Sequence, residues 1–125
     1  MNRSWPWVYG PTLAYMILII ILSSIPSMRP PDLGLSIEDK IAHLLEYGVL
    51  GALLARSVLL RKPFSIRLFI WIFLFGSLFG VSDEIYQKFV PNRNASPWDA
   101  LADTIGVFFG LLIYWNWKSR HVDAE

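Results

Sequence analysis

The stretch Leu13–Leu22 reads LAYMILIIIL and contains no charged side chain. It is the centre of an apolar block that runs from about residue 5 to residue 25. A helix needs about 20 apolar residues to cross the hydrocarbon core of a bilayer, so the length of this block predicts a membrane-spanning helix. Trp5, Trp7 and Tyr9 lie at one end of the block, where aromatic side chains are typical of the membrane–water interface.

Three further apolar blocks follow, at about residues 38–60, 64–86 and 97–117, and each is long enough to span a bilayer. We expect Ser36 to be the N-cap of the second block. The fourth should begin at Pro97 after Ser96, since proline is favoured in the first turn of a helix. The pattern predicts an all-α, integral membrane four-helix bundle with short loops, a single domain of residues 1–125 with antiparallel neighbouring helices.

The composition agrees with a membrane protein and excludes several other classes. Hydrophobic residues make up 54% of the chain and charged residues 17%, whereas soluble domains carry roughly 25% charged residues. The formal net charge is +1, which provides no basic surface for nucleic acid, so the expected partner is the lipid bilayer. The chain has no cysteine, which excludes disulfides, thiolate zinc sites and cysteine nucleophiles.

The basic residues predict how the helices are oriented. With four spans, the N-terminus, the second loop and the C-terminus share one side of the membrane. That side carries most of the 11 basic residues, namely Arg3, Arg56, Arg61, Lys62, Arg67, Lys118 and Arg120. The other side carries Arg29, Lys40, Lys88 and Arg93. Because cytoplasmic loops are enriched in Lys and Arg, we expect a multi-pass protein of the cell membrane with both termini cytoplasmic.

Ionisable and polar residues are concentrated at the predicted outer ends of the second, third and fourth helices. They are Asp39, His43 and Tyr47 on the second, Asp83, Glu84 and Gln87 on the third, Arg93 in the third loop, and Asp99 and Asp103 on the fourth. The spacing i, i+4 recurs on all three helices and places such pairs on one helical face. Charged side chains inside a span normally face the bundle interior or a wet cavity, so we expect them to converge near the outer membrane face.

Three roles fit these residues. A hydrogen-bonded and ion-paired network would pin the helix ends together. Alternatively, they would form a ligand-binding pocket in which Arg93 grips an anionic or polar headgroup. In the third role, a general base would be drawn from the catalytic candidates His43, Asp39, Asp83 and Glu84. One histidine with several carboxylates could hold a divalent ion, but nothing matches a zinc signature such as HExxH, so neither a metal nor a cofactor is expected.

The third and fourth spans also carry small and aromatic residues whose positions predict packing. Gly76 and Gly80, like Gly106 and Gly110, are four residues apart, which lets helix backbones approach closely. Packing within the chain is the expected use, because a four-helix bundle needs such faces. The aromatic residues of the third span are expected to face lipid: Phe69, Trp71, Phe73, Phe75 and Phe79.

Two polar segments resemble the VanZ-like family of small membrane proteins. Residues 39–50, DKIAHLLEYGVL, are similar to the family pattern D-K-x-x-H-x-x-x-Y-x-x-L. Residues 82–99, SDEIYQKFVPNRNASPWD, are similar to D-E-x-x-Q-x-F-x-P-x-R-x-x-S-x-x-D. The resemblance covers most of the chain from Asp39 to Gly110. The chain departs from the family pattern at Asn92, where glycine is usual, and at Asp103, where asparagine is usual.

The family's namesake is associated with low-level resistance to the glycopeptide teicoplanin, through an altered cell surface. The resemblance therefore implies a cell-envelope protein with an outward-facing polar pocket, linked to antibiotic resistance. Such a pocket would bind or modify a lipid-linked or headgroup-bearing ligand, such as a cell-wall ligand. The alternative is a non-catalytic accessory or interaction protein whose polar residues form only a structural clasp.

Overall fold

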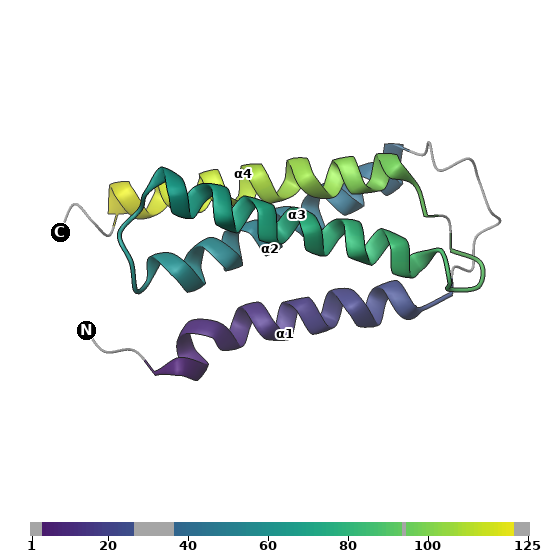
Figure 1. Cartoon of the computed structure of the whole chain (residues 1–125), viewed down its shortest axis with the longest axis horizontal. Coiled ribbons are helices and arrows are strands. Elements are labelled where there is room, and N and C mark those ends of the chain that lie inside the picture. Colours follow the sequence, from purple (N-terminus) through teal and green to yellow (C-terminus); the bar gives the residue numbers. More distant parts are fainter. Residues whose placement is uncertain (1–3, 27–36, 94, 122–125) are drawn as a thin grey trace.

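Residues 4–26, 37–93 and 95–121 are described by the structure, a computed structural model, and they form four helices without a strand. The helices are α1 (Trp5–Ser24), α2 (Ile37–Leu59), α3 (Ile66–Gln87) and α4 (Pro97–His121). Successive helices run in opposite directions along one axis, so α1 begins and α4 ends at the same end of the bundle (Figure 1). We call this the terminal end, and the other the opposite end. The predicted all-α bundle is confirmed.

The helix limits follow the predicted spans closely, with one extension. The α4 helix continues to His121, one turn beyond the predicted end, and its last turn carries Lys118 and Arg120. Basic side chains there interact favourably with the negative end of the helix dipole, which supports the extra turn. At the start of α4, the Ser96 hydroxyl oxygen accepts a hydrogen bond from the backbone N–H of Trp98 at 3.1 Å. The expected cap at Ser36 lies outside the described residues.

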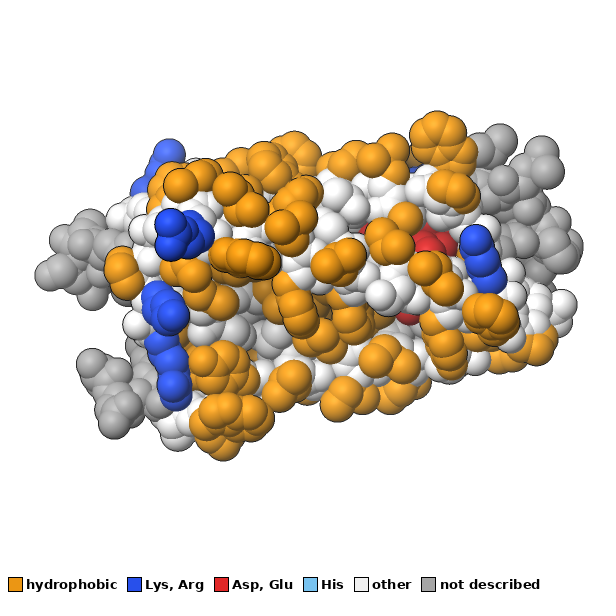
Figure 2. All heavy atoms as spheres, viewed as in Figure 1, with side chains coloured by type: hydrophobic (Ala, Val, Ile, Leu, Met, Phe, Trp, Pro, Cys, Tyr) orange, Lys and Arg blue, Asp and Glu red, His pale blue; other side chains and the backbone are white. Residues whose placement is uncertain are grey.

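All four helices are long and apolar enough to cross a membrane. Large hydrophobic side chains point outward over the length of the bundle, and Ile17, Leu45, Leu78 and Ile113 are each more than half exposed. Figure 2 shows hydrophobic side chains spread over the visible face, with most of the visible Lys and Arg at the terminal end. An apolar exterior of this extent is typical of a lipid-facing surface. The chain is therefore a multi-pass membrane protein.

Glycines bring α2 and α4 into backbone contact. A Cβ atom added at Gly51 would meet the backbone of Val107, and one added at Gly110 would meet the carbonyl group of Gly48. A Cβ atom added at Gly106 would lie 2.5 Å from the carbonyl oxygen of Leu44. Small residues allow such close approach in membrane bundles. The predicted use of Gly106 and Gly110 in intrachain packing is thus confirmed.

The aromatic residues of α3 divide between two environments. Trp71 and Phe75 are exposed, as expected for lipid-facing side chains. The expectation was wrong for Phe69, Phe73 and Phe79, which pack against the buried core. The physical reason lies on α4, where the ring of Phe108 lies 5.7 Å from that of Phe69 and 6.1 Å from that of Phe73, both edge-on. Such edge-to-face pairs favour aromatic contact over exposure to lipid.

Candidate functional site

Nine polar residues of three helices meet at the opposite end of the bundle. We call them the polar cluster: Asp39, Lys40, His43 and Tyr47 from α2, Asp83, Glu84 and Gln87 from α3, and Asp99 and Asp103 from α4. Figure 2 shows acidic side chains at this end of the visible face, framed by hydrophobic ones. All but Asp39 and Lys40 are buried, so most of the cluster is enclosed by the helices.

Lys40 joins α2 to α4. Its ammonium group lies 2.5 Å from Oδ1 of Asp99 and 3.3 Å from Oδ2 of Asp39. The Asp99 side chain is only 1% exposed, so its charge has lost almost all contact with solvent. Burial of a carboxylate is costly unless an opposite charge or hydrogen bonds compensate for the lost water. Lys40 therefore supplies the compensation for one oxygen of Asp99.

His43 lies at the centre of the cluster, between carboxylates on both sides of its ring. Its Nδ1 lies 2.8 Å from Oδ1 of Asp103 and 3.6 Å from Oε1 of Glu84. Its Nε2 lies 3.7 Å from Oδ2 of Asp99 and 3.9 Å from Oδ1 of Asp39. These distances confirm the prediction that His43 lies close to acids of the third and fourth helices. A histidine oriented by a carboxylate in this way can serve as a base or as a metal ligand.

The α3 residues tie the cluster to the other helices. Oδ2 of Asp83 accepts hydrogen bonds from the Tyr47 hydroxyl at 3.1 Å and from Nε2 of Gln87 at 3.2 Å. Gln87 also donates to the hydroxyl of Ser23 on α1, at 3.1 Å. Oε2 of Glu84 accepts the backbone N–H of Ser96, at 3.2 Å, just before α4 begins. These contacts fix the ends of all four helices relative to one another.

Three carboxylate oxygens in the cluster have no hydrogen-bond donor among the residues that the structure describes. Oε1 of Glu84, Oδ2 of Asp99 and Oδ2 of Asp103 are buried and accept no hydrogen bond within the described part of the chain. Buried polar atoms in proteins nearly always have a partner, and each exception calls for an explanation. The acids of the cluster also outnumber its bases, Lys40 and His43. The cluster therefore has an excess of hydrogen-bond acceptors and of acidic groups within the described residues.

The candidates named from the sequence are gathered here with one exception. Arg93 was expected to lie beside these acids and to grip an anionic or polar headgroup. In the region that the structure covers, none of the ion pairs involves its guanidinium, and its backbone N–H bonds to the carbonyl oxygen of Val90. The basic residue that pairs with Asp99 is Lys40, which lies one residue after Asp39 on the helix that packs against α4.

Lys40 was the functional residue missing from the predicted ligand-binding set. Its signal was its position in the D-K segment that begins at Asp39. The side chain of a lysine is long enough to reach across to a neighbouring helix. From the sequence alone, however, nothing shows that it points toward α4 rather than toward the membrane surface.

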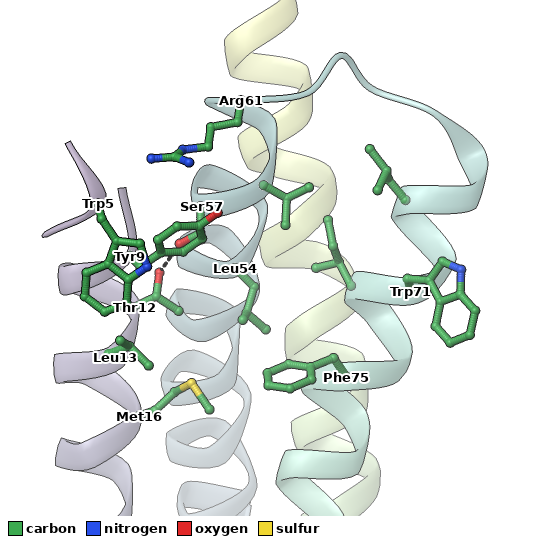
Figure 3. A pocket seen from close by; sticks show the side chains of 13 residues that line it. Trp5, Tyr9, Thr12, Leu13, Met16, Leu54, Ser57, Arg61, Trp71 and Phe75 are labelled. Atoms are coloured by element: carbon green, nitrogen blue, oxygen red, sulfur yellow. Dashed lines mark hydrogen bonds between the residues drawn. The ribbon is translucent and has the colours of Figure 1, made fainter. Parts of the chain in front are cut away.

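Two hollows in the surface differ in their relation to the cluster. A groove of about 320 Å³ lies beside Lys40, and its other walls are Trp98, Leu101, Ala102 and Ile105 of α4. A larger cavity of about 680 Å³ lies at the terminal end between α1, α2 and α3. Figure 3 shows Arg61 at one side of that cavity and the Thr12–Ser57 hydrogen bond on its wall. None of the residues that line the larger cavity belongs to the polar cluster, so it is a separate feature.

Comparison with known protein families matches residues 12–118 to the VanZ/LLP1 family. Because the match spans all but the two ends of the sequence, the chain belongs to this family. The resemblance read from the two polar segments is thereby confirmed. Comparison with curated proteins and with solved structures gives no match.

Proposed function

We propose that this member of the VanZ/LLP1 family is a cell-envelope membrane protein whose polar cluster binds the headgroup of a lipid or lipid-linked ligand. The observation that carries the proposal is the set of buried carboxylate oxygens on Glu84, Asp99 and Asp103 that accept no hydrogen bond in the described residues. A bound group bearing positive charge or hydroxyl and amine donors would satisfy them. Leaving such atoms without partners costs about 1–3 kcal/mol each.

The competing role is a structural clasp, and the same oxygens count against it. A clasp is most stable when every buried carboxylate oxygen has a donor, because a partly satisfied network is worse than an apolar one. The contacts of Asp83 fit a clasp, since its Oδ2 accepts from both Tyr47 and Gln87. Those of Asp99 and Asp103 fit it only in part, because one oxygen of each is left over. The clasp thus accounts for Asp83 and leaves one oxygen each of Glu84, Asp99 and Asp103 unexplained.

The groove beside Lys40 supports a ligand with a hydrocarbon chain. Apart from Lys40, the groove is lined by the apolar or small side chains of Trp98, Leu101, Ala102 and Ile105. A lipid chain lying along α4 would keep its apolar contacts in the bilayer, while its headgroup meets the cluster at the helix ends. Ligand sites of this kind combine an apolar lining with a few polar groups that orient the ligand.

The proposed orientation places the cluster at the outer leaflet and both termini in the cytoplasm. The basic residues of the described loops and helix ends favour it, because Arg56, Arg61, Lys62 and Arg67 flank the α2–α3 connection. In this orientation the cluster faces the outer surface of the cell membrane. This location fits a role in the response to glycopeptide antibiotics such as teicoplanin.

Lipid retention tests the proposal directly. The protein is purified in detergent and incubated with phosphatidylglycerol, phosphatidylethanolamine or a polyprenyl phosphate, and native mass spectrometry counts the lipids that remain bound. We expect one retained lipid for the wild type and none for Asp99→Asn. Trp71→Ala is the matched control, because Trp71 lines the separate cavity at the terminal end. Retention that is lost in Trp71→Ala and unchanged in Asp99→Asn would contradict the assignment to the cluster.

A second measurement links binding to the cell surface. A bacterial host that lacks the protein is complemented with the wild type, Asp99→Asn or Trp71→Ala, and its teicoplanin susceptibility is compared. We expect the wild type and Trp71→Ala to change susceptibility equally, and Asp99→Asn to have no effect. An effect of the Asp99→Asn protein equal to that of the wild type would remove the cluster from the proposed function.

A further inference from the structure

We propose that Asp39, His43 and Asp99 bind a divalent transition-metal ion, of which Zn²⁺ and Mn²⁺ are the best fits. The inference rests on the proposed function and deepens it, because the ion would be the positive group through which the polar cluster takes up an anionic headgroup. The site is built from two helices, with Asp39 and His43 one turn apart on α2 and Asp99 in the first turn of α4.

The three ligand atoms have the spacing that a shared ion requires. Nε2 of His43 lies 3.7 Å from Oδ2 of Asp99 and 3.9 Å from Oδ1 of Asp39. Nitrogen and oxygen ligands lie about 2.0–2.2 Å from a zinc ion, so two ligands of one ion are up to about 4.4 Å apart. Both distances fall within that limit, and all three ligand atoms lie within 4.8 Å of one another, so small side-chain adjustments would let one ion contact all three.

Lys40 orients both carboxylates toward the histidine. Its ammonium group contacts Oδ2 of Asp39 and Oδ1 of Asp99, which are the oxygens that do not face His43. The remaining oxygen of each carboxylate is thereby directed at Nε2. Outer partners that fix the ligands of a metal in this way are a general feature of metal sites.

Asp103 plays the corresponding part for the histidine. Its Oδ1 lies 2.8 Å from Nδ1 of His43, the length of a direct N–H···O hydrogen bond. An ionised carboxylate can only accept, so the proton belongs on Nδ1 and the lone pair of the neutral ring on Nε2. A carboxylate–histidine–metal arrangement requires this tautomer.

Oδ2 of Asp99 supports the metal site independently of the ligand spacing. Nε2 of His43 lies 3.7 Å from Oδ2 of Asp99 and 3.9 Å from Oδ1 of Asp39, and both distances are too long for a hydrogen bond. Oδ2 of Asp99 lies within this arrangement on a side chain that is 1% exposed, and no donor in the described residues reaches it. An ion at this point would contact Oδ2 of Asp99, and its positive charge would offset the negative charge of the acids in the cluster.

The identity of the ion follows from the ligands and from access. A mixed set of one imidazole and two carboxylates suits Zn²⁺ or Mn²⁺, whereas Mg²⁺ and Ca²⁺ favour oxygen ligands alone. Asp39 is 43% exposed, so the ion can enter from the aqueous side. The other possible set, His43 with Glu84 and Asp103, is fully buried and uses the nitrogen that is already bonded to Asp103. Three protein ligands leave further positions on the ion for water or an anionic group.

Metal titration of the whole chain tests the inference. Protein without an affinity tag is stripped with a chelator in detergent and titrated calorimetrically with ZnCl₂ and MnCl₂. We expect one ion per chain, and more than about tenfold weaker binding for Asp39→Asn and Asp99→Asn. The matched controls are Glu38→Gln, an exposed acid beside Asp39, and His121→Gln, which removes the other histidine. Both controls should bind as the wild type does, and circular dichroism verifies that each variant is folded.

A measurement on the unmodified protein complements the variants. Pulsed electron paramagnetic resonance of the Mn²⁺ complex should show coupling to a histidine nitrogen. Absence of stoichiometric binding, binding without nitrogen coupling, or binding lost in His121→Gln would each overturn the inference. The metal titration contains no lipid, so it tests the metal site independently of lipid binding. A protein that binds the metal ion but retains no lipid would refute the proposed function alone. A protein that retains lipid and binds no metal would refute the metal site alone.

Discussion

Replacing Gly110 by alanine should destabilise the bundle by about 1–3 kcal/mol, the usual cost of forcing an extra carbon into a tightly packed contact. The added Cβ atom would overlap the carbonyl oxygen of Gly48, and it would lie 2.8 Å from the carbonyl carbon of Gly48 and 3.0 Å from the backbone nitrogen of Ala52. These are all backbone atoms of α2. They cannot rotate away as a side chain can, so α2 and α4 must move apart.

The same substitution at Gly10 is the matched control. A Cβ atom added there has no atom of another element within 4 Å, and Gly10 lies inside α1. Alanine is favoured over glycine in a helix by about 0.5–1 kcal/mol, so Gly10→Ala should leave the stability unchanged or raise it slightly. The two substitutions alter the intrinsic helix preference equally. Any difference in sign between them therefore reports the contact between α2 and α4.

Equilibrium unfolding in mixed detergent micelles, followed by circular dichroism as the SDS fraction rises, measures the free energy of both variants. The expected result is a transition at lower SDS for Gly110→Ala and at the same or higher SDS for Gly10→Ala. Equal stabilities for the two variants would refute the reasoning, because they would show that α2 and α4 are not in backbone contact at Gly110.

Three further predictions concern orientation and local stability. The chain has no cysteine of its own, so Lys88→Cys should react with an impermeant thiol reagent in intact cells while Lys62→Cys should not; the reverse pattern would invert the proposed orientation. Asn92 has a φ of 60°, in the left-handed region that favours glycine, so Asn92→Gly should raise the melting temperature and Asn92→Ala should lower it. Tyr47→Phe removes the hydroxyl that donates to Asp83, and a loss of about 1–2 kcal/mol is expected in the SDS titration; an unchanged midpoint would show that this hydrogen bond adds nothing.

The fold was predictable because membrane spans are specified locally. Apolar runs such as Leu13–Leu22 are long enough to cross a bilayer whatever surrounds them, and short connections leave little choice of direction. The convergence of the polar residues was predictable for a related reason. Since charged groups avoid lipid, Asp39, His43 and Asp103 had to face the bundle interior once the spans were known.

The contacts within the cluster could not be derived in the same way. They depend on the rotation of each helix and on the choice among several nearby partners. Both Lys40 and Arg93 lie near the acidic residues in the sequence, and only the packing of α2 on α4 determines that Lys40 pairs with Asp99. The division of the α3 aromatics has the same origin, because the position of Phe108 on α4 determines that Phe69 is packed and Trp71 is exposed.

The glycine contacts and the polar cluster depend on each other. An aspartate carries its carboxylate on a single methylene, so Asp103 can reach His43 at 2.8 Å only when the two helix backbones are close. Gly106, one turn further along α4, provides this closeness by packing on the carbonyl oxygen of Leu44, the residue after His43. A substitution that separates α2 from α4 should therefore weaken the site as well as the fold. Gly110→Ala should lower the Zn²⁺ affinity of the folded protein, whereas Gly10→Ala should not; equal affinities in the calorimetric titration would show that the site tolerates a wider spacing of the helices than its short side chains suggest.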